Sequence, residues 1–312
     1  MTVTVLVSGG LGYLGGRLLL HLRAAGHVRL RASTRRPPAT TASWTEGIEL
    51  VQAELTDAHA LARACEGADA VIHLAALNAA AAAADPQSAI RINIDGTRLL
   101  LAAARQAGVR RFVYFSTAHV YGAPLEGDLD ENTPAANPHP YAATHRRAEE
   151  LVLSAPLRGL VFRLSNSFGA PADSSANCWA LLVNDLCRQA ATKGSLTLNG
   201  TGLETRDFVP LSDVVRAVSF FLDQSDAMWG NGLFNLASGA TTTTLAMAER
   251  IAARVREVLG IIPSIAHRPI VSAPPRPFRI IISKLRAAGF EPRGDADKEI
   301  DATLRLCHQA FR

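Results

Sequence analysis

Residues 3–15 read VTVLVSGGLGYLG, a β-rich run that passes directly into a glycine-rich turn, and apolar residues at helical spacing follow over 11–25. In a strand–turn–helix unit of this kind, Gly9 can form the tight turn and Gly12 can let backbone approach a pyrophosphate, while Gly15 lets the helix pack on the strand. The N–H groups at the helix start would face the anion. The order of the three parts therefore predicts a dinucleotide-binding unit, with contacts from Gly9, Gly12, Tyr13, Leu14 and Gly15.

Apolar runs and helical patterns alternate through the first half of the chain. Strand-like runs lie at 28–33, 69–75, 111–115 and 160–164, and helical patterns lie at 57–65, 88–107 and 141–154. Because strands such as 69–75 are apolar on both faces, we predict an α/β fold with a doubly wound parallel (Rossmann) sheet covered by helices on both sides. We expect a dinucleotide-binding domain at 1–164, with returning segments at about 203–237. A smaller, interleaved substrate lobe would comprise 165–202 and 238–312.

The composition argues against several classes of protein. Of 312 residues, 48% are hydrophobic and 19% are charged, which excludes a disordered chain. Apolar stretches such as Leu18–Leu20 and Ala79–Ala84 are far shorter than the roughly 20 residues of a membrane span. No signal peptide is visible, so we expect a cytoplasmic protein with no membrane contact. A net charge of +4 without a basic, aromatic stripe predicts no nucleic-acid binding. The four cysteines lack metal-site spacing, so we expect free thiols and no metal.

The end of the second predicted strand bears on the choice of dinucleotide. An acid at this position usually receives the ribose hydroxyls of NAD, whereas an arginine accommodates the 2′-phosphate of NADP. The chain has no acid here but offers Ser33, Thr34, Arg35 and Arg36. NADP(H) is therefore favoured over NAD(H), unless the two arginines are only solvated loop charges.

Further motifs extend over almost the whole chain: DAVIHLAA at 69–76, NIDGT at 93–97, FSTAHVYG at 115–122, YAATH at 141–145, FRLSN at 162–166 and TRDFV at 205–209. With these motifs the chain resembles the extended short-chain dehydrogenase/reductases, in the nucleotide-sugar epimerase/dehydratase group. The resemblance implies an NAD(P)-dependent oxidoreductase that forms a homodimer through the helices 88–107 and 141–154. It also implies cofactor contacts from Glu54, Leu55, Leu74, Ala75, Ala76, Asn78, Asn93, Ser116, Tyr141, His145 and Leu164.

The family chemistry implied for this chain is hydride transfer between nicotinamide C4 and a carbinol or carbonyl carbon. Tyr141 would exchange a proton with the substrate oxygen while Thr117 hydrogen-bonds that oxygen. A tyrosine with a pKa near 10 needs cationic help to act as a base near neutrality, and the family supplies a lysine four residues on. Here that position is His145, on the same helix face. His145 can replace the lysine, or act as a spacer while Tyr141 works with the cofactor charge alone. The third interpretation is a weakly active site in a nicotinamide-sensing binding protein.

Several residues would contact the substrate by the same resemblance. Arg206 stands where the family often binds a nucleotide diphosphate, and a guanidinium suits that group; the alternative is a structural ion pair with Asp207 or Asp213. Asn166 would contact the sugar nucleotide, and a second arginine would be Arg276 or Arg268.

The dehydratase branch carries Asp-Glu after the catalytic threonine, where this chain has Ala118-His119. We therefore expect ketoreduction or epimerisation of a nucleotide-activated sugar, with His119 as a further substrate contact or acid/base. The apolar run 280–282 before Ser283-Lys284 supports the alternative of a hydrophobic or secondary-metabolite ketone.

Overall fold

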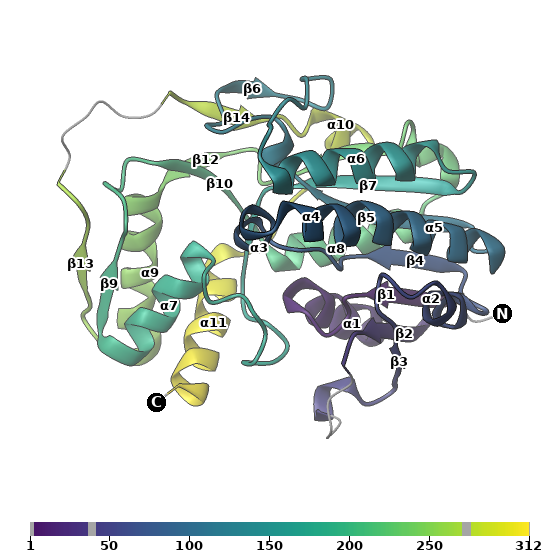
Figure 1. The fold of residues 1–312 in the computed structure, drawn as a ribbon. Helices are drawn as coiled ribbons and strands as arrows, with labels where there is room; N and C mark the ends of the chain where they lie inside the picture. Colours follow the sequence, from purple (N-terminus) through teal and green to yellow (C-terminus); the bar gives the residue numbers. More distant parts are fainter. Residues whose placement is uncertain (1–2, 37–41, 270–275, 312) are drawn as a thin grey trace.

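A computed structural model describes residues 3–36, 42–269 and 276–311 of the chain (Figure 1). Its centre is a sheet of seven parallel strands in the order β11-β7-β5-β4-β1-β2-β3. The predicted doubly wound α/β fold is confirmed. The strands are β1 (Val3–Ser8), β2 (Val28–Thr34), β3 (Ile48–Gln52), β4 (Ala70–His73), β5 (Arg111–Thr117), β7 (Arg158–Leu164) and β11 (Leu233–Leu236).

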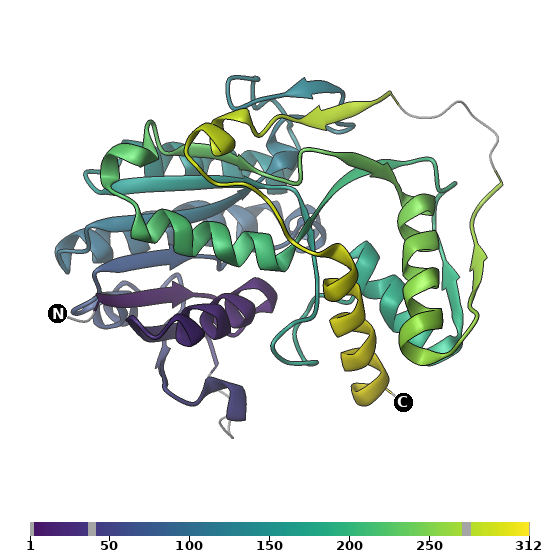
Figure 2. The same cartoon turned by 180° about the vertical axis from the view of Figure 1, so that it is seen from behind.

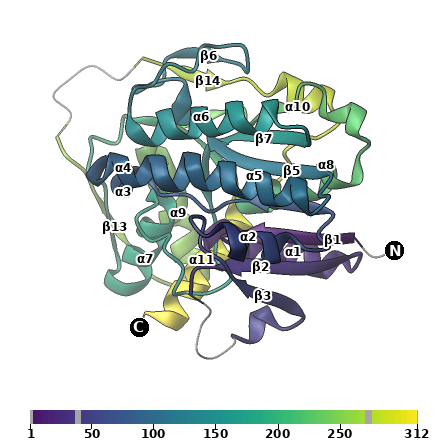
Figure 3. The ribbon, with the colours of Figure 1, turned by 45° about the vertical axis from the view of Figure 1, so that its right-hand side comes forward.

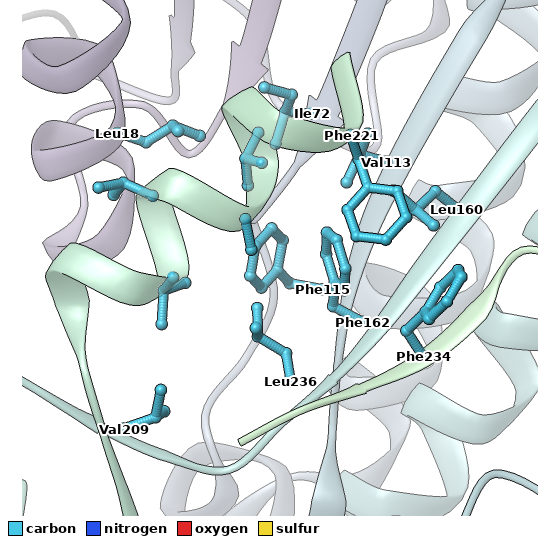
Figure 4. Close-up of a cluster of buried hydrophobic side chains, with 14 of the residues drawn as sticks. Leu18, Ile72, Val113, Phe115, Leu160, Phe162, Val209, Phe221, Phe234 and Leu236 are labelled. Carbon is cyan, nitrogen blue, oxygen red and sulfur yellow. The ribbon is translucent and has the colours of Figure 1, made fainter. Parts of the chain in front are cut away.

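Helices cover both faces of this sheet, as its apolar strands require. Figure 1 shows α2 (Ala58–Cys65), α5 (Gly96–Gln106) and α6 (Pro140–Ser154) on one face, and Figure 2 shows α1 (Tyr13–Ala25) and α8 (Leu211–Asp223) on the other. Each face encloses its own hydrophobic core. Figure 4 shows the core on the side of α1 and α8. There the rings of Phe162 and Phe221 pack edge to face, with their centroids 5.4 Å apart. Burial of this much apolar surface on both sides holds the strand ends in fixed positions.

The helix expected at 88–107 is interrupted. The structure has α3 (Ala79–Ala84), α4 (Pro86–Ala89), a π-helical turn at Ile90–Asp95 and then α5. The side chain of Asn78 caps α3, and that of Asp85 caps α4. Because Pro86 has no N–H to continue the first helix, the chain restarts at the Asp85 cap.

A second lobe lies beyond the carboxyl ends of the central strands (Figure 1). Its helices α7 (Leu182–Lys193), α9 (Thr244–Leu259) and α11 (Ala296–Ala310) share one core. Its strands form the sheets β12-β10-β8 and β13-β9. They are β8 (Asn166–Phe168), β9 (Ser195–Thr197), β10 (Thr205–Pro210), β12 (Thr241–Thr243) and β13 (Ser264–Ala266).

The lobes exchange segments differently from the expected division. β10, expected with the returning segments, pairs with β8 and β12 of the second lobe, whereas α8 and β11 do return to the central sheet. β14 (Phe278–Ile280), expected in the lobe, pairs with β6 (Gly127–Leu129), and α10 (Ser283–Ala287) follows it (Figure 3). Part of the proline-rich connection, 270–275, lies outside the described residues.

Within the described part of the chain, no helix is long and apolar enough to cross a membrane. The four cysteines are buried and unpaired, as expected. The residues that the structure describes contain no group of three or more His, Cys, Asp or Glu side chains placed to hold a metal ion.

Candidate active site

The glycine-rich loop follows β1 at the carboxyl edge of the sheet. Gly9 has φ +71°, and a β-carbon there would lie 3.0 Å from the backbone nitrogen of Ala75. A β-carbon on Gly15 would lie only 2.4 Å from the carbonyl oxygen of Gly9. Both positions therefore require glycine, one for its backbone conformation and one for close packing.

The start of α1 fits a dinucleotide pyrophosphate. Gly12 is exposed, and a β-carbon there would meet nothing within 4 Å except the Gly9 carbonyl oxygen at 3.1 Å. No side chain caps α1 at Gly12, so the N–H groups of the first turn stay available to an anion. Tyr13, also predicted to contact the cofactor, instead donates its hydroxyl hydrogen bond to the carbonyl of Gly169 (3.1 Å) and so ties α1 to the second lobe.

Arg35 and Arg36 are exposed after β2, and neither guanidinium pairs with a residue that the structure describes. Their backbone carbonyls are occupied: that of Arg35 accepts from Gln52 (3.2 Å) and that of Arg36 from the Thr34 hydroxyl (3.3 Å). Ser33 is buried, and its carbonyl accepts from Gly9 N–H (3.2 Å). The loop is thus held by its backbone while two positive side chains project from it.

Other predicted cofactor residues differ in their surroundings. Glu54 and Ala76 are exposed, and Leu74, Ala75 and Leu164 are half-buried near the strand ends. Asn78 serves as the cap of α3. Leu55 is buried against α5, where a β-carbon on Gly96 would lie 2.8 Å from it, so the Leu55 side chain is part of the core.

Asn93 is a correction to the prediction of a direct cofactor contact. It is 1% exposed, its amide oxygen accepts from Leu77 N–H (2.8 Å), and its amide nitrogen donates to the Thr144 hydroxyl (3.0 Å). Since the side chain is enclosed and bonded at both ends, it fixes the loop after β4 to α6 and does not face a ligand.

A pocket of about 230 Å³ opens where β5 and β7 end. Thr117 ends β5 and Tyr141 lies in the first turn of α6, and both line this pocket. A hydrogen bond to Thr117 lowers the pKa of Tyr141, but burial outweighs it, so the pKa is raised above its usual value. The lining residues are Ser116, Thr117, His119, Tyr141, Leu164, Ser165, Asn166, Ser167, Phe168, Leu181, Leu182, Val183, Arg206 and Phe208.

His145 packs directly against Tyr141, with ring centroids 4.5 Å apart in an edge-to-face arrangement. Its Nδ1 shares a 2.6 Å hydrogen bond with the Tyr114 hydroxyl, whereas its Nε2 is buried and has no hydrogen-bond partner. Burial lowers the pKa of His145 to about 4, so the imidazole is neutral at pH 7. The expected contact with a ribose would need neighbouring atoms to move, because Nε2 exposes no surface.

None of the chain's lysines stands in for the family lysine whose position His145 occupies. Of the chain's three lysines, Lys193 ends α7, Lys284 donates to the Leu233 carbonyl (2.5 Å) and Lys298 lies 3.5 Å from the Asp295 carboxylate. None of them lines the pocket around Tyr141.

On the substrate side, Asn166 and Arg206 line the pocket as predicted. The Asn166 amide donates to the Asp207 carbonyl (3.0 Å), which joins β8 to β10. Arg206 is exposed and forms no ion pair with any described residue, so the alternative of a pair with Asp207 or Asp213 is wrong. The Asp207 carboxylate instead accepts from the backbone N–H groups of Ser238 and Gly239 (2.9 Å each).

Two further predicted contacts have different outcomes. His119 is exposed at the pocket wall, where partial desolvation and the nearby Arg206 charge lower its pKa. Arg276 does not join the pocket: it precedes β14 and pairs with Glu126 of the neighbouring segment at 2.9 Å. The prediction of Arg276 as a diphosphate contact is therefore not supported by its position.

The sequence analysis missed a buried network beneath the pocket. The Arg163 guanidinium donates to Glu149 (2.7 Å), and the Ser116 hydroxyl donates to the same carboxylate (2.5 Å), so the hydroxyl hydrogen of Ser116 is already engaged. A usable signal was present: Glu149 follows His145 by one helical turn, and Arg163 interrupts the apolar strand at 160–164. Tyr114, which holds His145, carried no signal beyond its place in a strand.

Comparison with known proteins places these features in context. The family model "NAD dependent epimerase/dehydratase family" matches residues 5–237. The UDP-glucose 4-epimerase of Mycolicibacterium smegmatis is 33% identical over 80% of this chain and 82% of its own. The UDP-glucose 4-epimerase of Rhizobium leguminosarum bv. trifolii is 30% identical over 85% and 83%. The crystal structure of Thermus thermophilus UDP-glucose 4-epimerase in complex with NAD superimposes with a TM-score of 0.79, at 25% identity over 99% and 100% of the two chains.

Proposed function

Because the chain belongs to the NAD-dependent epimerase/dehydratase family, we propose that it transfers hydride at a carbinol or carbonyl carbon of a nucleotide-activated sugar, with Tyr141 as the acid/base. The sequence-based prediction of an enzyme of this family is confirmed. A nicotinamide dinucleotide, when bound, would accept or supply the hydride.

The observation that carries this proposal is the joint placement of Tyr141 and Thr117. They come from α6 and β5, their hydroxyl groups lie close enough for Thr117 to lower the pKa of Tyr141, and both line the same pocket at the carboxyl edge of the sheet. A substrate oxygen between the two hydroxyls would accept a hydrogen bond from Thr117 and exchange a proton with Tyr141. Both groups are held by packed elements, which keeps their geometry fixed.

For the cofactor, we propose NADP(H) in preference to NAD(H). The support is the pair of exposed guanidinium groups at Arg35 and Arg36, which form no ion pair with a described residue and suit a 2′-phosphate. The glycine loop fits the pyrophosphate that both dinucleotides share, so it does not discriminate between them.

For the substrate, we propose a nucleoside diphosphate sugar held by Arg206, Asn166 and the start of α7. Leu181, Leu182 and Val183 line the pocket at that helix start, and no side chain caps it. Its free N–H groups and the Arg206 guanidinium together suit a diphosphate. Phe168 and Phe208 also line the pocket, which favours a hydrophobic ketone as the second candidate.

The decisive experiment compares wild type with Tyr141→Phe. The proposed enzyme loses turnover of nucleotide-sugar substrates by at least about 100-fold but keeps its affinity for the dinucleotide, as followed by nicotinamide fluorescence. Turnover that survives in Tyr141→Phe would overturn the assignment. Binding titrations with UDP- and dTDP-sugars, and with hydrophobic ketones as the competing class, separate the two candidate substrates.

A homodimer through α5 and α6 stays a prediction, which light scattering would check.

A further inference from the structure

Among the residues that the structure describes, no cationic side chain lies beside Tyr141. Its ring meets the imidazole of His145 edge to face, and the neutral hydroxyl of Thr117 lies near its own hydroxyl. Burial is the largest influence on its proton affinity, and it favours the neutral phenol. Arg206 lines the same pocket but is exposed to solvent at its wall.

On the elements packed around Tyr141 and His145, the cationic side chains that the structure describes are exposed to solvent or ion-paired. The π-helical turn presents the neutral Asn93 to this region. Its Arg91 keeps its charge but is exposed and donates to the Ser88 hydroxyl, and its Asp95 pairs with Arg98. The sequences of α3 and α4 hold no charged residue. The titratable and charged side chains that face this region in the described part of the chain include Tyr114 from β5, His73 from β4, His119 after β5, and Arg163 from β7 with its partner Glu149 from α6. His139, which caps α6, also belongs to them, and its Nδ1 accepts the Tyr141 N–H (3.2 Å). The Arg163 charge is matched by the Glu149 carboxylate.

The Tyr114–His145 pair forms a neutral wall behind Tyr141. His145 is 3% exposed and Tyr114 is 1% exposed, and they share the 2.6 Å hydrogen bond. The buried Nε2 of His145 has no acceptor for a second proton, so a charged imidazolium would be left without a partner. His73 faces the same region and is itself bonded on both ring nitrogens, by Ser8 (2.6 Å) and Thr97 (3.0 Å).

We infer that Tyr141, walled by this neutral pair, enters the reaction as a protonated phenol and that the enzyme reduces a carbonyl group to a carbinol. An epimerase must begin by removing a proton from a carbinol, and because the described residues place no cation beside Tyr141, that step would depend on the charge of a bound oxidised nicotinamide alone. This inference rests on the proposed function, in which Tyr141 is the acid/base. It adds to that function the direction of the reaction, namely carbonyl reduction, which the surroundings of Tyr141 favour.

The reduction balances as follows. A reduced nicotinamide dinucleotide supplies hydride, which forms the new C–H bond at the carbonyl carbon as the C–O π bond breaks towards oxygen. The Tyr141 O–H bond breaks, its proton completes the carbinol, and solvent returns a proton to the phenolate. The carbonyl substrate is reduced and the dinucleotide is oxidised, so each turnover consumes one reduced dinucleotide.

The wild-type enzyme tests the inference in two ways. Tyrosinate absorbance, taken as the difference between wild type and Tyr141→Phe, should show Tyr141 ionising above pH 10. With NADPH, reduction of a keto-sugar nucleotide should proceed at pH 7, whereas carbinol oxidation with NADP⁺ should become measurable only at alkaline pH. Ionisation of Tyr141 near neutrality, or epimerisation at pH 7 without added reductant, would overturn the inference while leaving the proposed function intact. Full activity of Tyr141→Phe would instead overturn the proposed function.

A lysine introduced at His145 tests the cause. His145→Lys places a cation one helical turn from Tyr141. The pH at which Tyr141 ionises should therefore fall by about one unit, and the rate of carbinol oxidation at pH 7 should rise about tenfold. Ser154→Lys is the matched control, because it adds the same charge at the exposed end of α6, about 14 Å further along the helix. Equal effects of the two variants, or none from a folded His145→Lys, would contradict the inference. If circular dichroism shows that His145→Lys is unfolded, the wild-type titration still decides.

Discussion

The buried pair Glu149–Arg163 provides the sharpest test of how the site is held in place. The change is Glu149→Leu, which removes the carboxylate and keeps a side chain of similar volume. The Glu149 side chain is 4% exposed and that of Arg163 is 7% exposed, and the carboxylate accepts three hydrogen bonds from the guanidinium. It also accepts from Ser116, the residue before Thr117.

The magnitude follows from what the substitution leaves behind. Breaking a buried ion pair by removing one partner costs about 3–5 kcal/mol, since the remaining charge stays desolvated. Arg163 is poorly placed to recover, because its Nη1 is already buried without a hydrogen-bond partner. The unbonded Ser116 hydroxyl adds a further penalty that is not additive with the first. Against a typical stability of about 5–15 kcal/mol, the loss is large.

Urea unfolding at pH 7, followed by circular dichroism, measures the change in the free energy of unfolding. The double variant Glu149→Leu/Arg163→Met removes both charges and should regain most of the loss. Glu150→Leu is the matched control: its partner Arg147 and Glu150 itself are 57% and 51% exposed, so it should cost less than about 0.5 kcal/mol. A Glu149→Leu protein within about 1 kcal/mol of wild type, or a double variant no more stable than the single one, would refute the reasoning.

Three other predictions address the cofactor loop and acid stability. Arg35→Ala/Arg36→Ala should weaken NADPH binding at least about tenfold and leave NADH binding unchanged in a fluorescence titration, because each lost charge-assisted bond to the 2′-phosphate is worth about 1.5–3 kcal/mol; equal losses would contradict this role. Gly15→Ala should lower both dinucleotide affinity and the thermal midpoint, because its β-carbon would lie 2.4 Å from a backbone oxygen; an unchanged midpoint would contradict the geometry. Burial lowers the pKa of His73 to about 3 and that of His145 to about 4, so the unfolded chain binds protons below about pH 6.5 that the fold excludes. Stability should therefore fall between about pH 6.5 and pH 4 in urea unfolding, less so in His145→Gln, and a rise in this window would contradict the assignment.

The fold could be predicted because its signals are local. The glycines at 9, 12 and 15 and the alternation of apolar strands with helical patterns reflect backbone conformation and burial within single elements. The missed strands are short or polar, such as Gly127–Leu129 and Thr241–Thr243, and they form only because a distant segment pairs with them. The interrupted helix after β4 likewise depends on packing that no periodicity reveals.

The same distinction between local signals and tertiary packing applies to the site. The resemblance of the motifs to those of the family implied site roles for Thr117, Tyr141 and Arg206, and the structure brings all three to one pocket at the edge of the parallel sheet. Only the tertiary structure showed that His145 is enclosed and neutral, that Asn93 is bonded at both ends and that Arg276 lies elsewhere. Charge state and hydrogen-bond partners depend on solvent access and on residues far apart in the chain, and only the packed fold sets these.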